Sequence, residues 1–308
     1  MDEVMDPINV LVTLHRGYGL GDAVQMGPVL RHVARARPHW IIDYQAEEGK
    51  HQVGRGIVAN TFAHGKRYPS EHYDAEVQVV LYDTWAGWTD RPNTRVSSCL
   101  HERFGLGWDP ALMRYSVHVD PDSVSGAYTL LYEGVGKATV RPNRTVAVHY
   151  EGDSAVNKKN LSHGTASDIC ELIDKMGRRP AILDWRARSP LPFFKMRTPA
   201  AWGGSAEMVC AVVSQCEAFI GIDSGPSKCA SATSTPSLVV WTGHHPAAYH
   251  DPAPNTTHLV PDNYHSMHPV CGDEEVAAFF ERWYNVRTYD RDSSPVPIIK
   301  AWLEEVLS

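Results

Sequence analysis

The stretch FIGIDSGPSKCASATSTPSLVVWTGHHP, residues 219–246, decides the fold class of this chain. Its apolar runs predict two buried strands, and the small residues between them predict a helix that follows a tight turn. These four segments are 218–222, 223–225, 226–234 and 237–241. Strands that alternate with a helix in this way indicate a parallel sheet of the α/β class.

The turn at Asp223, Ser224 and Gly225 marks a candidate ligand site. In an open α/β sheet, ligands bind beyond the carboxyl ends of the strands, and a helix that starts there presents free N–H groups. Asp223 can hydrogen-bond a ligand hydroxyl, while Ser224 and Gly225 let the backbone approach a phosphate. Gly243 follows the next strand in the same way. The alternative is that the three turn residues simply cap the helix.

A second strand–turn–helix unit lies near the N-terminus. The apolar run 8–14 is followed by the loop HRGYGLGDAVQ at 15–25, and 40–44 predicts the next strand. The glycines have the spacing G-x-G-x-G, so the third comes one residue too early for the dinucleotide fingerprint, and Asp43 is the sole candidate for a ribose-binding acid. A nicotinamide enzyme is therefore disfavoured. Asp22, at the helix start, is either a cap or a general base that faces a cleft.

The remaining pattern extends this alternation over the whole chain. Further strands are predicted at 77–82, 115–119, 145–150 and 180–184, and helices at 95–104, 165–176, 205–215, 274–284 and 297–307. Residues 120–126 predict a turn, and the polar stretch 134–143 predicts a domain boundary. We therefore expect two doubly wound, Rossmann-like domains that face a central cleft, at 1–140 and 141–290, with a closing helix within 291–308.

Bulk composition limits the possible functions. The 308 residues are 43% hydrophobic and 21% charged, which is enough for two cores, and the net charge of −7 argues against a bulk electrostatic grip on nucleic acid or membrane. The six cysteines form no C-x-x-C pair and predict a reducing compartment. With no signal-peptide pattern and no apolar run long enough to span a membrane, a cytoplasmic location is expected.

Four segments together resemble a known enzyme family. LGDAVQMGPVLRHVARARP at 20–38 resembles the L-G-D loop and first helix of the heptosyltransferase-like family 9 glycosyltransferases, which belong to the GT-B superfamily. Residues 221–246 resemble that family's D-(S/T)-G-x-x-H segment. Residues 101–119 resemble the end of its N-terminal domain, and 157–173 its lysine loop. The resemblance touches both halves of the chain in the expected order.

The resemblance implies a GT-B fold in which the N-terminal domain receives the acceptor and the C-terminal domain holds a nucleotide sugar. It implies that Asp22 is the catalytic base and that no metal or other cofactor is needed. Lys159 is the best match for the family's phosphate-contacting lysine, with Lys158 as the rival. The implied donor-binding residues are Lys159, Asp223, Ser224, Gly225, Lys228, Gly243 and His244, and the acceptor-side residues are Gly19, Gly21 and Trp85.

Three departures from the family pattern bear on the donor. Lys228 stands where the family has histidine, and the acid that holds the nucleotide ribose has Asp184 as its nearest match. The last loop is bulkier and more polar than usual because of Trp241, His244 and His245. ADP-heptose therefore cannot be carried over as the donor. We expect His244 to contact sugar or phosphate and not a metal, because adjacent histidines lack regular ligand spacing.

These observations favour an inverting, metal-independent hexosyl- or heptosyltransferase. Its donor would be a nucleotide-diphosphate sugar, and its acceptor a glycan, a lipid-linked sugar or another hydroxyl-bearing molecule. Two alternatives stay open: a catalytically silent nucleotide- or sugar-binding protein of the same fold, and a glycosyltransferase that acts on a modified nucleic-acid base.

Overall fold

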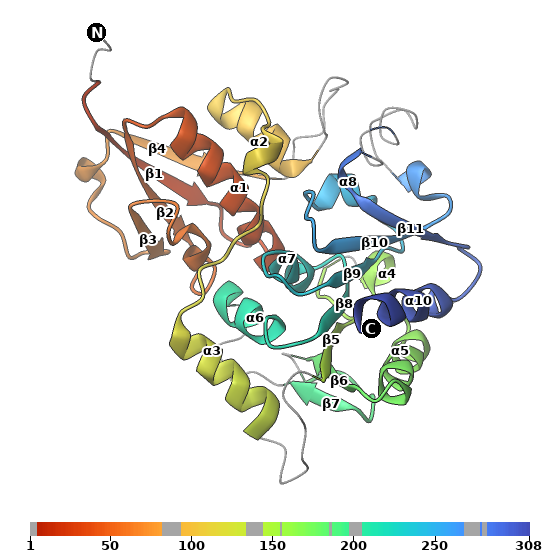
Figure 1. Cartoon of the computed structure of the whole chain (residues 1–308). Helices are drawn as coiled ribbons and strands as arrows, with labels where there is room; N and C mark the ends of the chain where they lie inside the picture. Colours follow the sequence, from red (N-terminus) through yellow and green to blue (C-terminus); the bar gives the residue numbers. More distant parts are fainter. Residues whose placement is uncertain are drawn as a thin grey trace.

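The protein folds into two parallel α/β units that pack against each other (Figure 1). The computed structural model describes residues 5–81, 94–133, 144–154, 156–184, 187–196, 205–267, 278 and 282–308. Within these residues, no helix combines the length and the apolar character that a membrane span needs.

The N-terminal unit is a four-stranded sheet in the order β3-β2-β1-β4 with all pairs parallel. Its strands are β1 (Ile8–Leu14), β2 (Trp40–Ala46), β3 (Asn60–Ala63) and β4 (Ala75–Val79), and its helices are α1 (Leu20–Ala36) and α2 (Arg95–Phe104). The glycine loop leads directly from β1 into α1, as the sequence predicts. Thr94 caps α2, because its hydroxyl accepts the N–H of Ser97 at 3.1 Å.

The C-terminal unit is a seven-stranded parallel sheet in the order β11-β10-β9-β8-β5-β6-β7. Its strands are β5 (Thr145–His149), β6 (Arg179–Leu183), β7 (Phe194–Met196), β8 (Ala218–Ile222), β9 (Ser237–Val240), β10 (Thr256–Pro261) and β11 (Asn285–Tyr289). Its helices are α4 (Val156–Lys159), α5 (His163–Lys175), α6 (Ala206–Val213), α7 (Gly225–Ser231), α8 (Pro246–Tyr249) and α10 (Val296–Val306). The predicted closing helix is α10, which packs on α5.

Two local predictions are wrong. Residues 115–119 pair with no strand in the described part of the chain, and the hydroxyl of Tyr115 donates to the buried carboxylate of Asp251. The stretch predicted as a turn begins α3 (Pro121–Tyr128), because Pro121 suits the first turn of a helix. Figure 1 shows α3 beside α6, on which it packs. The predicted boundary within 134–143 and most of the predicted helix at 274–284 lie outside the described residues.

The two units meet through the helices that follow their glycine turns. α1 packs on α7, and a β-carbon added to Gly225 would lie 2.7 Å from Cβ of Leu20 and 2.9 Å from the backbone nitrogen of Gly21. Any larger residue at Gly225 would push α1 and α7 apart. The two motifs found in the sequence are therefore in direct backbone contact.

Candidate active site in the cleft between the two units

A cavity of about 960 Å³ lies between the two units. The C-terminal unit lines it with residues from the carboxyl ends of β5, β6 and β8, where the strand order reverses direction between β5 and β8. This is the place where open α/β sheets bind ligands. The N-terminal unit contributes the glycine loop at 17–22, together with Glu47, Glu48, Lys50 and Arg95.

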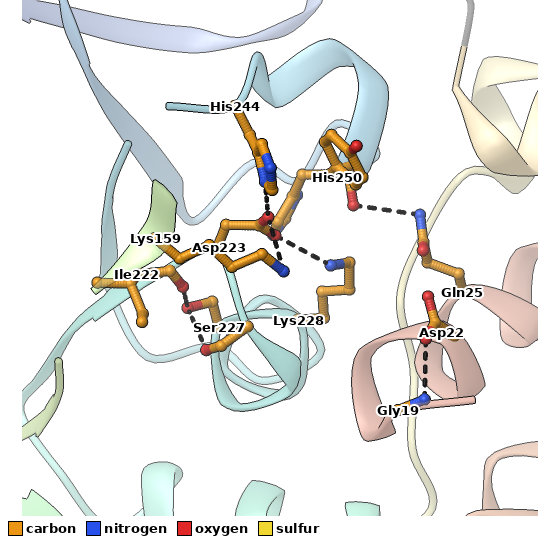
Figure 2. A network of polar contacts seen from close by, with 12 residues as sticks. Gly19, Asp22, Gln25, Lys159, Ile222, Asp223, Ser227, Lys228, His244 and His250 are labelled. Atoms are coloured by element: carbon orange, nitrogen blue, oxygen red, sulfur yellow. Dashed lines mark hydrogen bonds and ion pairs between the residues drawn. The ribbon is translucent and has the colours of Figure 1, made fainter. Parts of the chain in front are cut away.

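A buried carboxylate with three cationic or imidazole partners forms the centre of the cavity wall. The ammonium nitrogen of Lys159 lies 3.3 Å from Oδ2 of Asp223, and that of Lys228 lies 3.5 Å from Oδ1. Nδ1 of His244 donates to Oδ2 at 3.0 Å. Figure 2 shows the three side chains converging on Asp223 from three different elements. Because two ammonium groups share one carboxylate, this cluster of Asp223, Lys159 and Lys228 carries a net positive charge.

Burial and charge act in opposite directions in this cluster. Burial alone would raise the pKa of Asp223, but Lys228, the hydrogen bond from His244 and Lys159 outweigh it and hold that pKa well below its usual range. Burial lowers the pKa of Lys228, although Asp223 and Asp22 both oppose the shift. Asp223 therefore remains ionised and keeps the two lysines oriented toward the cavity.

The structure distinguishes the positions of the two adjacent lysines. Lys159 lines the cavity, whereas the backbone carbonyl of Lys158 accepts the hydroxyl of Thr242 at 2.7 Å. A β-carbon on Gly243 would lie 2.9 Å from that same carbonyl. Gly243 thus contacts the backbone of α4, which places Lys159 over Asp223, and it is not among the residues that line the cavity.

The turn after β8 offers fewer backbone N–H donors to a phosphate than a turn without proline would. Pro226 occupies the first turn of α7 and removes one backbone donor. The hydroxyl of Ser224 lies 3.1 Å from Nδ1 of His149, whose pKa burial lowers to about 4. Ser227 donates to the carbonyl of Ile222. Because Pro226 supplies no amide, the lysines must provide more of the positive charge.

Asp22 faces the cavity from the other unit. Its Oδ2 accepts the backbone N–H of Gly19 at 2.9 Å, and its Oδ1 accepts a guanidinium N–H of Arg95 at 2.6 Å. Asp22, Gly19 and Gly21 all line the cavity, and so do the donor-side residues Lys159, Asp223, Ser224, Gly225, Lys228 and His244. Both oxygens of Asp22 are thus fixed in place, and each keeps a further lone pair.

The remaining sequence predictions have mixed outcomes. Trp85 lies outside the described residues. Asp184 lines the cavity, but its oxygens accept the backbone N–H groups of Arg188 at 2.8 Å and Ser189 at 3.0 Å, so the carboxylate holds its own turn. In the described part of the chain, no group of three or more His, Cys, Asp or Glu side chains is arranged to hold a metal ion.

Arg95, His149 and Tyr249 are among the cavity residues that were not predicted. Arg95 is the first residue of α2 and its partner Asp22 is 73 positions away, so no local pattern pointed to the pair. His149 and Tyr249 end a strand and a short helix that the sequence did not mark as ligand-binding. For His149, its position at the carboxyl end of β5 was the available signal.

Comparison with solved structures identifies the architecture. A glycosyltransferase family 9 protein from Veillonella parvula superposes with a TM-score of 0.62 at 13% identity, covering 98% of each chain. The protein has the GT-B fold. ADP-heptose lipopolysaccharide heptosyltransferase II of Escherichia coli gives a TM-score of 0.55 at 13% identity, over 89% of this chain and 99% of that one.

A third GT-B structure is the dodecameric, iron-containing heptosyltransferase TibC in complex with ADP-D-β-D-heptose. It gives a TM-score of 0.59 at 15% identity, and the match covers 82% of this chain and 62% of that one. No protein-family model and no curated protein sequence that we compared with the chain matches it. At these identities the likeness is one of fold, so the chemistry must be argued from the cavity.

Proposed function

We propose that the protein is an inverting glycosyltransferase that uses a nucleotide-diphosphate sugar. The observation that carries this proposal is the cluster of Lys159, Lys228 and His244 around the buried Asp223, in a cavity that Asp22 faces from the opposite unit. A single displacement at a sugar carbon needs two features. One is a cationic site that holds the leaving diphosphate, and the other is a carboxylate across the same cavity that accepts the acceptor's proton. The GT-B architecture supports the same reading.

In this reaction the acceptor oxygen attacks the anomeric carbon from the face opposite the diphosphate. The new bond forms between that carbon and the acceptor oxygen, while the bond to the phosphate oxygen breaks. Asp22 takes the proton of the acceptor hydroxyl, and its hydrogen bonds to Gly19 and Arg95 hold it in place.

The leaving diphosphate carries negative charge that the donor site must stabilise. Lys159 and Lys228 do so as preorganised ammonium groups. His244 reaches the same carboxylate through Nδ1, so a neutral imidazole has its Nε2 lone pair free for a hydroxyl donor. The acceptor is a glycan, a lipid-linked sugar or another hydroxyl-bearing molecule.

The variant Asp22→Asn tests the proposal. It should retain nucleotide binding and lose at least ~10²-fold in turnover, the contribution of a general base. Binding is measured by calorimetry with ADP and UDP, and turnover by release of nucleotide from ADP- and UDP-sugars. The matched control is Asp74→Asn, since Asp74 also accepts a backbone N–H, from Asn9 at 2.8 Å, but does not line the cavity. Full turnover by Asp22→Asn, or a product with retained anomeric configuration, would refute the mechanism.

A further inference from the structure

A continuous series of side-chain contacts crosses the cavity wall from one unit to the other. It runs through Asp22, Arg95, Tyr249, His244 and Asp223, all of which line the cavity. Beyond its bond to Asp22, the guanidinium of Arg95 has its Cζ 4.5 Å from the centre of the Tyr249 ring. That ring stacks on the imidazole of His244, with 4.5 Å between centroids and 22° between planes. Since His244 donates to Asp223, the series links the acceptor side to the donor cluster.

The N-terminal unit also docks on the C-terminal unit through Asp251. This carboxylate is fully buried, and it accepts the hydroxyl of Tyr115 at 2.9 Å and the amide of Gln25 at 3.3 Å. Both donors come from the N-terminal unit. Because Arg95 and Tyr249 belong to different units, their contact depends on how the two units pack.

We propose that Arg95 and Tyr249 are positioning residues that orient Asp22 and couple its position to the donor site. The inference rests on the proposed function, in which Asp22 is the base. A base must be held in near-attack geometry, and a displacement of about 1 Å can cost ~10²-fold in rate. Arg95 supplies a rigid planar group between the carboxylate and the ring. Tyr249 fixes that group from the C-terminal unit, so Asp22 is correctly placed when the units approach as they do here.

The test measures kcat and donor affinity for Arg95→Ala, Tyr249→Leu and the double variant. With ADP-glucose and UDP-glucose as probes, we expect kcat to fall ~10²-fold for Arg95→Ala and ~10-fold for Tyr249→Leu. The affinity for ADP and UDP should change by less than ~3-fold. Because the two residues act as one unit, the double variant should be no slower than Arg95→Ala. The control is Arg37→Ala, which removes a guanidinium 5.9 Å from the Trp40 ring, outside the cavity, and should keep full kcat.

Two further measurements separate this inference from the proposed function. In an Asp22→Asn background, Arg95→Ala should cause no further loss of kcat, because the carboxylate that Arg95 orients is already gone. Full turnover by Asp22→Asn alone would refute the proposed function. An inactive Asp22→Asn beside an Arg95→Ala variant with normal kcat, or with altered donor affinity alone, would refute only the inference.

A crystal structure of Arg95→Ala gives a readout that does not depend on turnover. We expect the Asp22 carboxylate to leave the backbone N–H of Gly19, which it accepts at 2.9 Å in the intact protein. A carboxylate that stays on Gly19 without Arg95 would overturn the positioning role.

Discussion

Replacing Gly225 with alanine should separate the two units and lower both stability and turnover. The added β-carbon would lie 2.7 Å from Cβ of Leu20 and 2.9 Å from the backbone nitrogen of Gly21. Carbon atoms in contact rest about 3.5–4.0 Å apart, so α1 and α7 must move by on the order of 1 Å. Overpacking of this kind costs about 1–3 kcal/mol of unfolding free energy.

The assay is thermal unfolding, followed by turnover of a nucleotide sugar. At about 2–4 °C per kcal/mol, the melting temperature should fall by roughly 2–12 °C. Turnover should fall by up to ~10²-fold, because Asp22 on α1 and the donor site at α7 move relative to each other. This loss of turnover should exceed the loss that local destabilisation of the fold alone would cause.

The matched control is Gly27→Ala, on the same helix α1. A β-carbon there would meet Ser116 and Val53 at 3.6 Å, which is ordinary contact, and alanine in a helix interior gains about 0.5–1 kcal/mol over glycine. Gly27→Ala should therefore melt at or above the temperature of the natural protein. If Gly225→Ala melts within ~1 °C of the natural protein and keeps its turnover, the close packing of the two motifs is not required and the reasoning is refuted.

Two further predictions follow from the same site. Lys159→Ala should weaken ADP or UDP binding by ~10–100-fold, since a hydrogen bond to a charged group is worth about 1.5–3 kcal/mol. Lys158→Ala should change the affinity by less than ~3-fold. Equal losses of affinity in the two variants, measured by calorimetry, would contradict the placement of Lys159 in the cavity. Burial lowers the pKa of His149 to about 4 in the folded protein. The unfolded chain, with a histidine pKa near ~6.5, therefore binds more protons between these values, so His149 should cost ~2 kcal/mol of stability as the pH falls from 7 to 5. Urea unfolding at both pH values should show a shallower loss for His149→Gln than for the natural protein, and identical losses would contradict the prediction.

Elements with a strong local pattern were predictable from the sequence. The strand at 8–14 and the helix at 95–104 have the predicted bounds, because an unbroken apolar run and a well-capped amphipathic segment each specify one structure. The strand predicted at 115–119 is absent because the alternating pattern begins at Tyr115, whose side chain contacts Asp251 and His250 of the C-terminal unit. The prediction of a turn at 120–126 was wrong because Asp-Pro-Asp suits a helix start as well as a turn.

The candidate site was predictable where chain topology alone brings residues together. Asp223 directly follows β8, and Asp22 lies in the first turn of the helix that follows β1, so both fall at a carboxyl edge of a sheet. The pairing of Arg95 with Asp22, and its contact with Tyr249, could not be predicted, because they depend on how the two units dock. The family resemblance favoured Lys159 over Lys158, but the residue pattern alone could not separate them, since a helical turn that begins one residue later would exchange them.

The most direct test of the central claim is a thermal-shift screen with ADP-, UDP-, GDP-, CDP- and dTDP-sugars, and with NAD as a control. A ligand at 100 times its Kd stabilises the folded state by about 2.7 kcal/mol. We predict that at least one nucleotide sugar raises the melting temperature by roughly 5 °C or more, and that Lys159→Ala loses this shift while Lys158→Ala keeps it. A shift with NAD alone, or a nucleotide-sugar shift that Lys159→Ala leaves unchanged, would contradict the claim that this cavity holds a glycosyl donor.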